Sequence, residues 1–286
     1  MRRSASFIRS SSPQRLTVAI GASVNSGNGA SSGHVRVFGY NVADRSWGQL
    51  GGDIDGANAG DESGSAISLS ANGTTLAIGS PENDDNGSDA GHTRVFRFDS
   101  ISNRWQQIGS NLEGEADGDN SGHSVALSDD GNTVAVGAIR NAGNGIESGQ
   151  TRVYRYLDLA DSWIQLGMDI DGESEDDQSG RSVSLSGDGN VVAIGAIYNS
   201  DSGEFAGHAR VLVYSPLTNS WRQLGGDIDG EAEEDNFGWS VALSADGHTV
   251  AIGAPYSDGN GNAAGHTRIY RYDTVAKTWN QLGADI

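Results

Sequence analysis

The repeating unit of this chain is clearest in residues 238–286, which read GWSVALSADGHTVAIGAPYSDGNGNAAGHTRIYRYDTVAKTWNQLGADI. The stretches SVALS and TVAIGA alternate bulky and small residues, and Asp246-Gly247 between them is a strong signal for a tight hairpin turn. A loop rich in Gly and Asn follows, then a third apolar stretch, TRIYRY, and a fourth centred on Trp279. No part of the chain shows the 3.6-residue apolar period of a helix. The unit therefore predicts four short strands.

The same unit recurs along the chain at a fixed interval. Five tryptophans lie 58 residues apart, and five arginines follow the same step. The tryptophans are Trp47, Trp105, Trp163, Trp221 and Trp279, and the arginines are Arg36, Arg94, Arg152, Arg210 and Arg268. Tandem four-stranded units of this length predict an all-β fold, a β-propeller of tandem four-stranded blades with five 58-residue repeats visible. Each strand pair has one bulky and one small face, so we expect neighbouring blades to interdigitate.

The repeat also suggests a domain organisation. Residues 1–14 form a basic, Ser-rich lead-in in which we expect a degenerate opening strand near Ile8 to Ser12. Residues 15–286 are expected to form a single β-propeller domain. The chain holds almost five units, which leaves two alternatives. It is either a five-bladed ring or a fragment of a larger propeller whose partners include further repeats of the same polypeptide.

Composition narrows the classes of function. The chain has 18 basic and 38 acidic residues and a formal net charge of −20, which repels nucleic acids and anionic membranes. It contains no Cys, which excludes disulfides, thiolate metal sites and cysteine nucleophiles. No apolar run is long enough for membrane insertion. Nucleic acid and membrane are therefore not expected as partners.

Two short motifs in the last unit resemble a known family. Phe237-Gly238 opens its first strand and Gly253-Ala254-Pro255 closes its second, and this spacing resembles the FG-GAP repeat of integrin α-subunit-type β-propellers. Gly79-Ser80-Pro81 is close to the second half of the motif. The resemblance implies an extracellular or cell-surface adhesion or ligand-binding propeller, often with Ca²⁺ in the hairpin between the first two strands. That hairpin here lacks the D-x-D-x-D-G ligand series.

Carboxylates gather in the loops between consecutive units. Ca²⁺ takes about six to eight oxygen ligands, so these loops could hold calcium, the one cofactor that the sequence suggests. The candidate ligands are Asp61, Asp119, Asp177, Asp235, Glu115, Glu173 and Glu231. The alternative is a solvated acidic surface, which fits a chain with a single lysine, Lys277, beside 17 arginines.

The recurring arginines predict a structural role in each unit. We expect each guanidinium to pair with a recurring aspartate such as Asp119, since the two residue types match as a bidentate pair. Fivefold anion binding is the alternative.

One repeat position varies more than its neighbours. It opens the first strand of each unit and is occupied by Ser65, His123, Arg181 and Trp239. Trp and Arg are common binding anchors, and His can donate or accept a hydrogen bond. We predict that these four residues line a ligand-binding rim; the alternative is relaxed sequence at an exposed strand end.

These features favour a non-catalytic recognition or adhesion module, extracellular or at the cell surface, that binds a glycan or a protein on one propeller face. No unique acid pair, catalytic zinc spacing or nucleotide-binding motif indicates an enzyme, so no catalytic residue is predicted. One alternative is a glycan-processing enzyme on a five-bladed propeller. Another is a purely structural segment of a longer adhesion protein.

Overall fold

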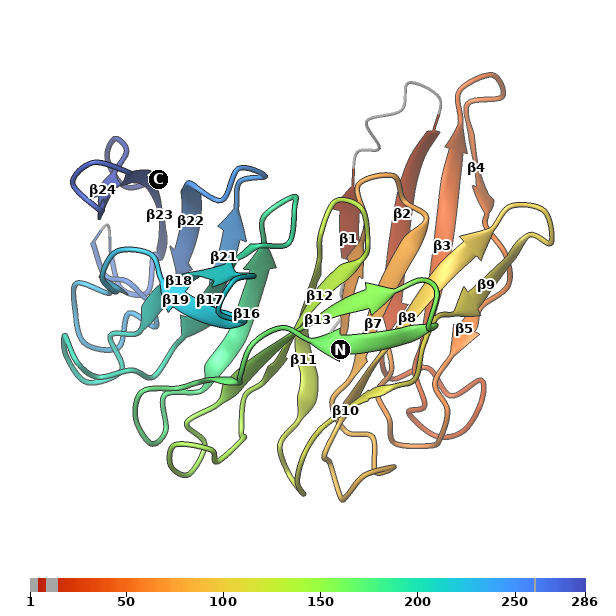
Figure 1. The fold of residues 1–286 in the computed structure, drawn as a ribbon, viewed down its shortest axis with the longest axis horizontal. Coiled ribbons are helices and arrows are strands. Elements are labelled where there is room, and N and C mark those ends of the chain that lie inside the picture. The colour runs from red at the N-terminus through yellow and green to blue at the C-terminus, as the bar shows by residue number, and fades with distance from the viewer. Residues whose placement is uncertain (1–4, 9–14, 260) are drawn as a thin grey trace. The chain divides into compact units, whose positions relative to one another are not determined.

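The computed structural model describes residues 5–8, 15–259 and 261–286 (Figure 1). Within these ranges every regular element is a β-strand, and all strand pairs of the sheets are antiparallel, which confirms the predicted all-β class. None of the described residues belongs to a helix long and apolar enough to cross a membrane. The chain divides into two compact units: unit 1 is Met1–Val134 with Tyr154–Ile164, and unit 2 is Ala135–Val153 with Gln165–Ile286.

The strands within the described ranges form five sheets, one for each repeat. In unit 1 the first sheet has the order β1 (Ala5–Ile8), β2 (Arg15–Ala22), β3 (His34–Asn41), β4 (Ser46–Gln49), and β5 (Ile54–Asp55) also pairs with β3. The second sheet contains β6 (Ala66–Leu69), β7 (Thr75–Ser80), β8 (His92–Asp99) and β9 (Arg104–Gln107), and β10 (Leu112–Glu113) pairs with β8.

The third sheet contributes strands to both units. It contains β11 (Ser121–Leu127), β12 (Thr133–Ala138), β13 (Gln150–Leu157), β14 (Ser162–Gln165) and β15 (Ile170–Asp171). The fourth sheet, in unit 2, contains β16 (Ser179–Leu185), β17 (Val191–Ala196), β18 (His208–Ser215), β19 (Ser220–Gln223) and β20 (Ile228–Asp229). The fifth contains β21 (Ser240–Leu243), β22 (Thr249–Ala254), β23 (His266–Asp273) and β24 (Thr278–Gln281).

The opening strand of the first repeat lies earlier than we expected. We predicted it near Ile8 to Ser12, whereas β1 runs from Ala5 to Ile8 and pairs with β2. Residues 1–4 and 9–14 of the predicted lead-in lie outside the described residues. The boundary predicted at residue 15 stays a prediction.

The hairpin turns between the first two strands of the repeats form as predicted. Gly73, Gly131, Gly189 and Gly247 have φ angles of 69, 71, 67 and 70°, in the left-handed region that glycine adopts without a steric penalty. The Ser70 hydroxyl donates to Asn72 Oδ1 at 2.8 Å and accepts from the backbone N–H of Thr75 at 2.9 Å. The turn residues therefore satisfy their own polar groups and fix the strand register.

Neighbouring sheets share an apolar core and approach closely at glycine positions. In unit 1, Ala19 and Val35 of the first sheet share a buried core with Ile67, Ile78 and Phe96 of the second. A Cβ atom at Gly21 would collide with the carbonyl oxygen of Gly64. In unit 2, a Cβ atom at Gly195 would collide with the carbonyl oxygen of Gly238 in the same way. Neighbouring sheets therefore approach closely at glycine positions within both units, and the interdigitation of bulky and small faces stays a prediction.

Candidate functional site

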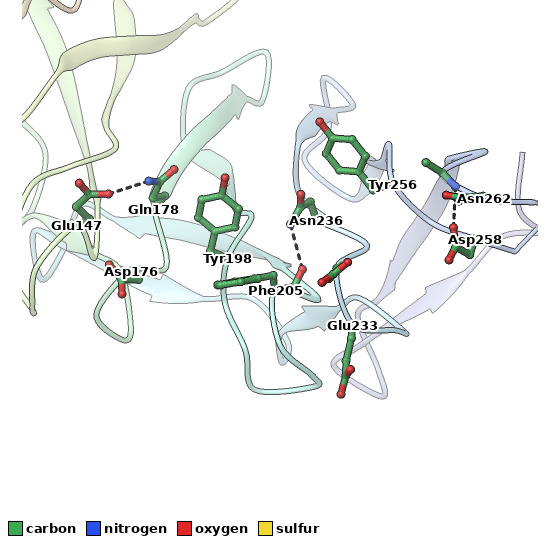
Figure 2. Close-up of a pocket in the computed structure, with 12 residues that line it drawn as sticks. Glu147, Asp176, Gln178, Tyr198, Phe205, Glu233, Asn236, Tyr256, Asp258 and Asn262 are labelled. Atoms are coloured by element: carbon green, nitrogen blue, oxygen red, sulfur yellow. Dashed lines mark hydrogen bonds between the residues drawn. The ribbon is translucent and has the colours of Figure 1, made fainter.

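A pocket of about 730 Å³ lies in unit 2, among the loops at the end of the sheets where β17 and β22 finish and β16 and β21 begin. It is lined by Glu147, Asp176, Gln178, Tyr198, Phe205, Glu233, Glu234, Asn236, Tyr256, Asp258, Asn262 and Ala263 (Figure 2). The loops between the second and third strands of three repeats supply part of this lining, and the loops that connect repeats supply the rest. The pocket is therefore built by positions that recur in the 58-residue unit.

Three aromatic side chains line the pocket. The rings of Tyr198 and Phe205 meet edge to face, with centroids 5.2 Å apart and an interplanar angle of 63°. The ring of Tyr256 meets Trp239 at 5.7 Å and 89°. Phe205 and Tyr256 are 39% and 48% exposed, so each keeps part of its ring free of protein contact. Partly exposed rings held by neighbouring rings are typical platforms for ligands with an apolar face.

The polar lining of the pocket consists of carboxylates and amides. Five lining residues are acidic, three carry amide groups, and none is Lys or Arg. Gln178 Nε2 donates to Glu147 Oε2 at 2.9 Å (Figure 2). Asn236 Nδ2 donates to the backbone oxygens of Ile197 and Phe205, both at 3.1 Å. The pocket thus offers mainly hydrogen-bond acceptors and negative charge, which favours ligands that carry hydroxyl groups or positive charge.

The loops that carry the lining have an unusual backbone conformation and bond to one another. Glu147, Phe205 and Ala263 occupy the same repeat position, and their φ angles are 49, 53 and 46°. The backbone oxygens of Glu147 and Phe205 accept hydrogen bonds from the N–H groups of Gln178 and Asn236 at 3.0 and 3.2 Å. Non-glycine residues adopt left-handed φ values only at a cost of about 1–2 kcal/mol each. The hydrogen bonds between the loops hold this costly conformation in place, and Ser31 and Asp89 adopt it at the same position of the first two repeats.

The structure brings together two of the four residues predicted to form a rim. The Arg181 guanidinium carbon lies 4.2 Å from the centroid of the Trp239 ring. The backbone N–H groups of Arg181 and Trp239 donate to the backbone oxygens of Gln178 and Asn236, at 3.2 Å in both cases. Since Trp239 also contacts Tyr256, the pair borders the pocket.

The other two predicted rim residues lie in unit 1. The Ser65 hydroxyl donates to the backbone oxygen of Glu62 at 2.9 Å, and half-buried His123 lies within β11. Neither belongs to the lining of the pocket in unit 2. The binding role of the four rim residues stays a prediction.

The recurring aspartates of the acidic loops are buried and hold their own loops together. Asp177 Oδ2 accepts from the backbone N–H groups of Glu173 and Ser174 at 3.1 and 2.9 Å, and Asn199 Nδ2 lies 3.3 Å from both carboxylate oxygens. Asp119 accepts the equivalent bonds from Glu115 and Ala116. Asp61 accepts from the backbone N–H of Asn58, and Asp235 is buried as well. The calcium role of these residues, Glu115, Glu173 and Glu231 stays a prediction.

Four of the recurring arginines have partners that we did not expect. Arg36 donates to Asp53 at 2.8 Å, Arg210 lies 3.3 Å from Glu173, and Arg268 pairs with Glu231 and Asp285. Arg94 donates to the backbone oxygen of Asp55 at 2.7 Å. Pairing with the recurring aspartates was therefore wrong for these copies, because loop N–H groups and amides already bind the carboxylates of Asp61, Asp119 and Asp177.

Sequence reasoning missed the aromatic lining of the pocket, although a usable signal was present. Tyr198 and Tyr256 share one repeat position with Val24, Glu82 and Arg140. Phe205 shares another position with Ser31, Asp89, Glu147 and Ala263. Both positions vary between repeats as strongly as the one that contains Arg181 and Trp239. Variation between repeats was the criterion by which we chose the rim residues, and the same criterion would have chosen these two positions.

The tandem antiparallel sheets of four or five strands define the chain as an all-β protein of the β-propeller class. Residues 228–270 match the family model described as FG-GAP repeat, which supports the resemblance stated from the sequence. A comparison of the sequence with curated proteins gives no match.

Three solved structures illustrate the likeness in fold. The first is a protein assigned as a 6-phosphogluconolactonase from Bacteroides uniformis ATCC 8492, with 14% identity and a TM-score of 0.58 over 94% of this chain and 67% of that chain. The second is KlAtg21 in complex with the coiled coil of AgAtg16, with 16% identity and a TM-score of 0.57 over 97% and 68%. The third is Kuenenia stuttgartiensis hydrazine synthase, with 14% identity and a TM-score of 0.50 over 97% and 70%. At these identities the likeness concerns the fold alone.

Proposed function

We propose that this protein is a non-catalytic recognition module that binds a glycan through the pocket of unit 2. The observation that carries this proposal is the arrangement of exposed aromatic rings beside carboxylate and amide groups on fixed loops. Tyr198, Phe205 and Tyr256 offer surfaces for the C–H faces of a sugar ring, while Glu147 and Asp258 offer acceptors for its hydroxyl groups. The absence of Lys and Arg from the lining disfavours sulfated or phosphorylated sugars.

A protein ligand is the second candidate, and the same lining supports it. Five carboxylates and three aromatic rings also suit a lysine or arginine side chain, through ion pairs and cation–π contacts. A glycan is favoured because acceptors are distributed around the pocket rather than gathered at one point (Figure 2). The extracellular or cell-surface location is proposed from the resemblance to FG-GAP repeats.

The proposal is tested by screening the purified chain against an array of neutral oligosaccharides and measuring the hits by calorimetry. Replacing Tyr198 or Tyr256 by Ala should weaken binding by about tenfold or more, since stacked aromatic contacts are worth about 0.5–1.5 kcal/mol beyond their buried area. Val24→Ala is the matched control, because it changes the same repeat position in unit 1 and should leave affinity unchanged. Binding that survives both tyrosine variants would reject the pocket as the site.

The carboxylates of the pocket also allow a test of the alternative function, which is glycan processing. Glycan processing requires an acid and a base that flank the scissile bond, and Glu147, Asp176, Glu233, Glu234 and Asp258 are the lining candidates. Incubating the wild type with each glycan hit and analysing the products separates the two functions. Turnover that a single carboxylate-to-amide variant abolishes without loss of binding would replace recognition by glycan processing.

A further inference from the structure

Among the residues that the structure describes, two histidines are buried with no hydrogen-bond partner at either ring nitrogen. His92 and His208 occupy the same position in the second and fourth repeats, and their side chains are 0% and 1% exposed. In each ring both Nδ1 and Nε2 lack a hydrogen-bond partner. Buried imidazoles almost always have such a partner, because leaving a polar group unsatisfied in the protein interior is costly. The two rings therefore require an explanation.

Carboxylates converge on the Nδ1 atom of His92. Asp85 Oδ2 lies 3.8 Å from it and Glu113 Oε2 lies 3.7 Å from it, which is too long for hydrogen bonds. The fold dictates this convergence, because β10 pairs with β8 in a register that sets Glu113 directly opposite His92. Asp85 approaches from the loop between β7 and β8. The three ligand atoms lie within 4.8 Å of one another.

A second cluster of the same composition lies in unit 2. It consists of Glu173, His208 and Asp227, whose ligand atoms also lie within 4.8 Å of one another. Glu173 Oε2 is 3.9 Å from His208 Nδ1, while Glu173 Oε1 lies 3.3 Å from the guanidinium of Arg210. Asp227 precedes β20, the short strand that pairs with β18 beside His208. Glu173 and Asp227 occupy different repeat positions from Asp85 and Glu113. The histidine is therefore the one repeat position that both clusters share.

The electrostatic setting of His92 favours a bound cation. Burial lowers the pKa of His92 to about 4, with the charge of Arg94 as the next cause, so the ring is neutral near pH 7. The neutral ring itself adds no positive charge between the two carboxylates. Asp61 adds a further negative charge near the ring and offsets Arg94. The cluster thus has the excess negative charge that suits a dication.

We propose that Asp85, His92 and Glu113 bind one divalent transition-metal ion and that Glu173, His208 and Asp227 bind a second. A ring nitrogen with two carboxylate oxygens is a donor set suited to Zn²⁺ and its neighbours, whereas Ca²⁺ takes oxygen ligands alone. Ligand atoms around a tetrahedral Zn²⁺ lie about 3.3 Å apart, given bonds of about 2.0–2.1 Å. The distances of 3.7 and 3.8 Å at His92 need to shorten by only a few tenths of an ångström.

The third repeat supplies a natural comparison for this site. Gln150 occupies the position of His92 and His208, is equally buried, and its Nε2 lies 3.3 Å from Asp171 Oδ1. The same fold therefore accommodates a glutamine here, bonded to a carboxylate by its own amide. Replacing either histidine by glutamine is thus expected to remove a metal ligand while preserving the fold.

The experiment measures Zn²⁺ binding to the full chain after treatment with EDTA, by calorimetry and by metal analysis after dialysis. We expect two ions per wild-type chain, one for His92→Gln, one for His208→Gln and none for the double variant. His266→Gln is the matched control: it changes the same repeat position, but His266 Nδ1 already bonds Ser257 Oγ at 2.8 Å, so two ions should remain.

The absorption spectrum of the Co²⁺-loaded chain gives an independent readout of the ligand set. Each histidine variant should lower the visible d–d bands by about half, with unchanged near-ultraviolet circular dichroism showing that the fold is retained. A wild type that binds no Zn²⁺ after dialysis, or histidine variants that keep both ions, would overturn the proposal.

Discussion

The indole Nε1 of Trp105 donates a hydrogen bond of 2.9 Å to the backbone oxygen of Leu50, 55 residues earlier in the chain. The same bond recurs in the later repeats, between Trp163 and Ile108, Trp221 and Leu166, and Trp279 and Leu224. Each of these four tryptophans therefore joins its own repeat to the preceding one. Trp47 of the first repeat is 50% exposed, although it packs on Tyr40 just as Trp105 packs on Phe98.

The first prediction concerns this link between repeats. Trp105→Phe removes the hydrogen bond and part of the ring, and we expect it to lower the free energy of unfolding by about 1–2 kcal/mol. Trp47→Phe makes the same change at a ring that is 50% exposed, and should stay within about 0.5 kcal/mol of the wild type. Urea unfolding followed by circular dichroism measures both. Equal losses in the two variants would show that the indole bond contributes nothing.

The second prediction concerns the close approach of neighbouring sheets. Gly195→Ala would drive its Cβ into the carbonyl oxygen of Gly238, and backbone atoms cannot move aside as a flexible side chain can. We expect a loss of at least about 1–3 kcal/mol in the free energy of unfolding. At Gly226 no heavy atom lies within 4 Å of an added Cβ, so Gly226→Ala is the control and should be nearly neutral. Similar melting temperatures for the two variants would contradict this packing.

The third prediction concerns the pair that borders the pocket. The Arg181 guanidinium lies over the Trp239 ring, which in turn contacts Tyr256 of the lining. Arg181→Met removes a cation–π contact worth about 0.5–1 kcal/mol and should weaken binding of a glycan hit two- to fivefold. Arg181→Lys keeps a cation over the ring and should restore most of the affinity, which simple loss of packing would not explain. Arg222→Met, at an exposed position of the same unit, should leave affinity unchanged.

The fourth prediction concerns alkaline pH. The Tyr156 hydroxyl donates to Asp161 Oδ1 at 2.6 Å, and this bond, aided by burial, raises the pKa of Tyr156 to about 12. Because the folded-state pKa exceeds the ordinary value of about 10, the unfolded state loses its proton first. The stabilisation is fully present below pH 10 and is lost as the pH rises from about 10 to 12.

Unfolding measured at several pH values between 9 and about 12 tests this prediction, with phenolate absorbance as a second readout. Tyr156→Phe should remove a corresponding part of the alkaline decline in stability. Tyr214→Phe is the matched control, since the Tyr214 hydroxyl bonds the uncharged side chain of Asn219 at 2.7 Å. A decline that Tyr156→Phe leaves unaltered would contradict the assigned pKa.

Much of the fold follows from local signals in the sequence. The turn at Gly247 and the alternation on either side of it predict β21 and β22, and both strands form. The two-residue strands β10 and β20 were not predicted, because they extend sheets by pairing with distant strands and have too few residues to show an alternating pattern. The predicted partners of Arg36, Arg94, Arg210 and Arg268 were wrong for a related reason, because the partner of each arginine depends on which loop oxygens are already bound.

The candidate site depends on geometry that no single segment contains. Tyr198 and Asn236 lie 38 residues apart and line one pocket only because their sheets stack and their loops bond to one another. The left-handed conformation of Phe205, a residue type that gives no hint of it, sets the direction of the ring. Variation between repeats marks these positions in the sequence, whereas their convergence requires the folded chain.

The glycine contacts between sheets have an evolutionary consequence. Gly21 meets Gly64 and Gly195 meets Gly238, so in both units the two partners are separated by the same 43 residues. A duplicated stretch of 58 codons would therefore encode a repeat that already complements the neighbours on both of its sides. Unequal recombination within such a gene can change the number of repeats in one step without any compensating substitution at the new junction. Descendants of this chain are expected to differ in repeat number more readily than in the sequence of the contacts that join repeats.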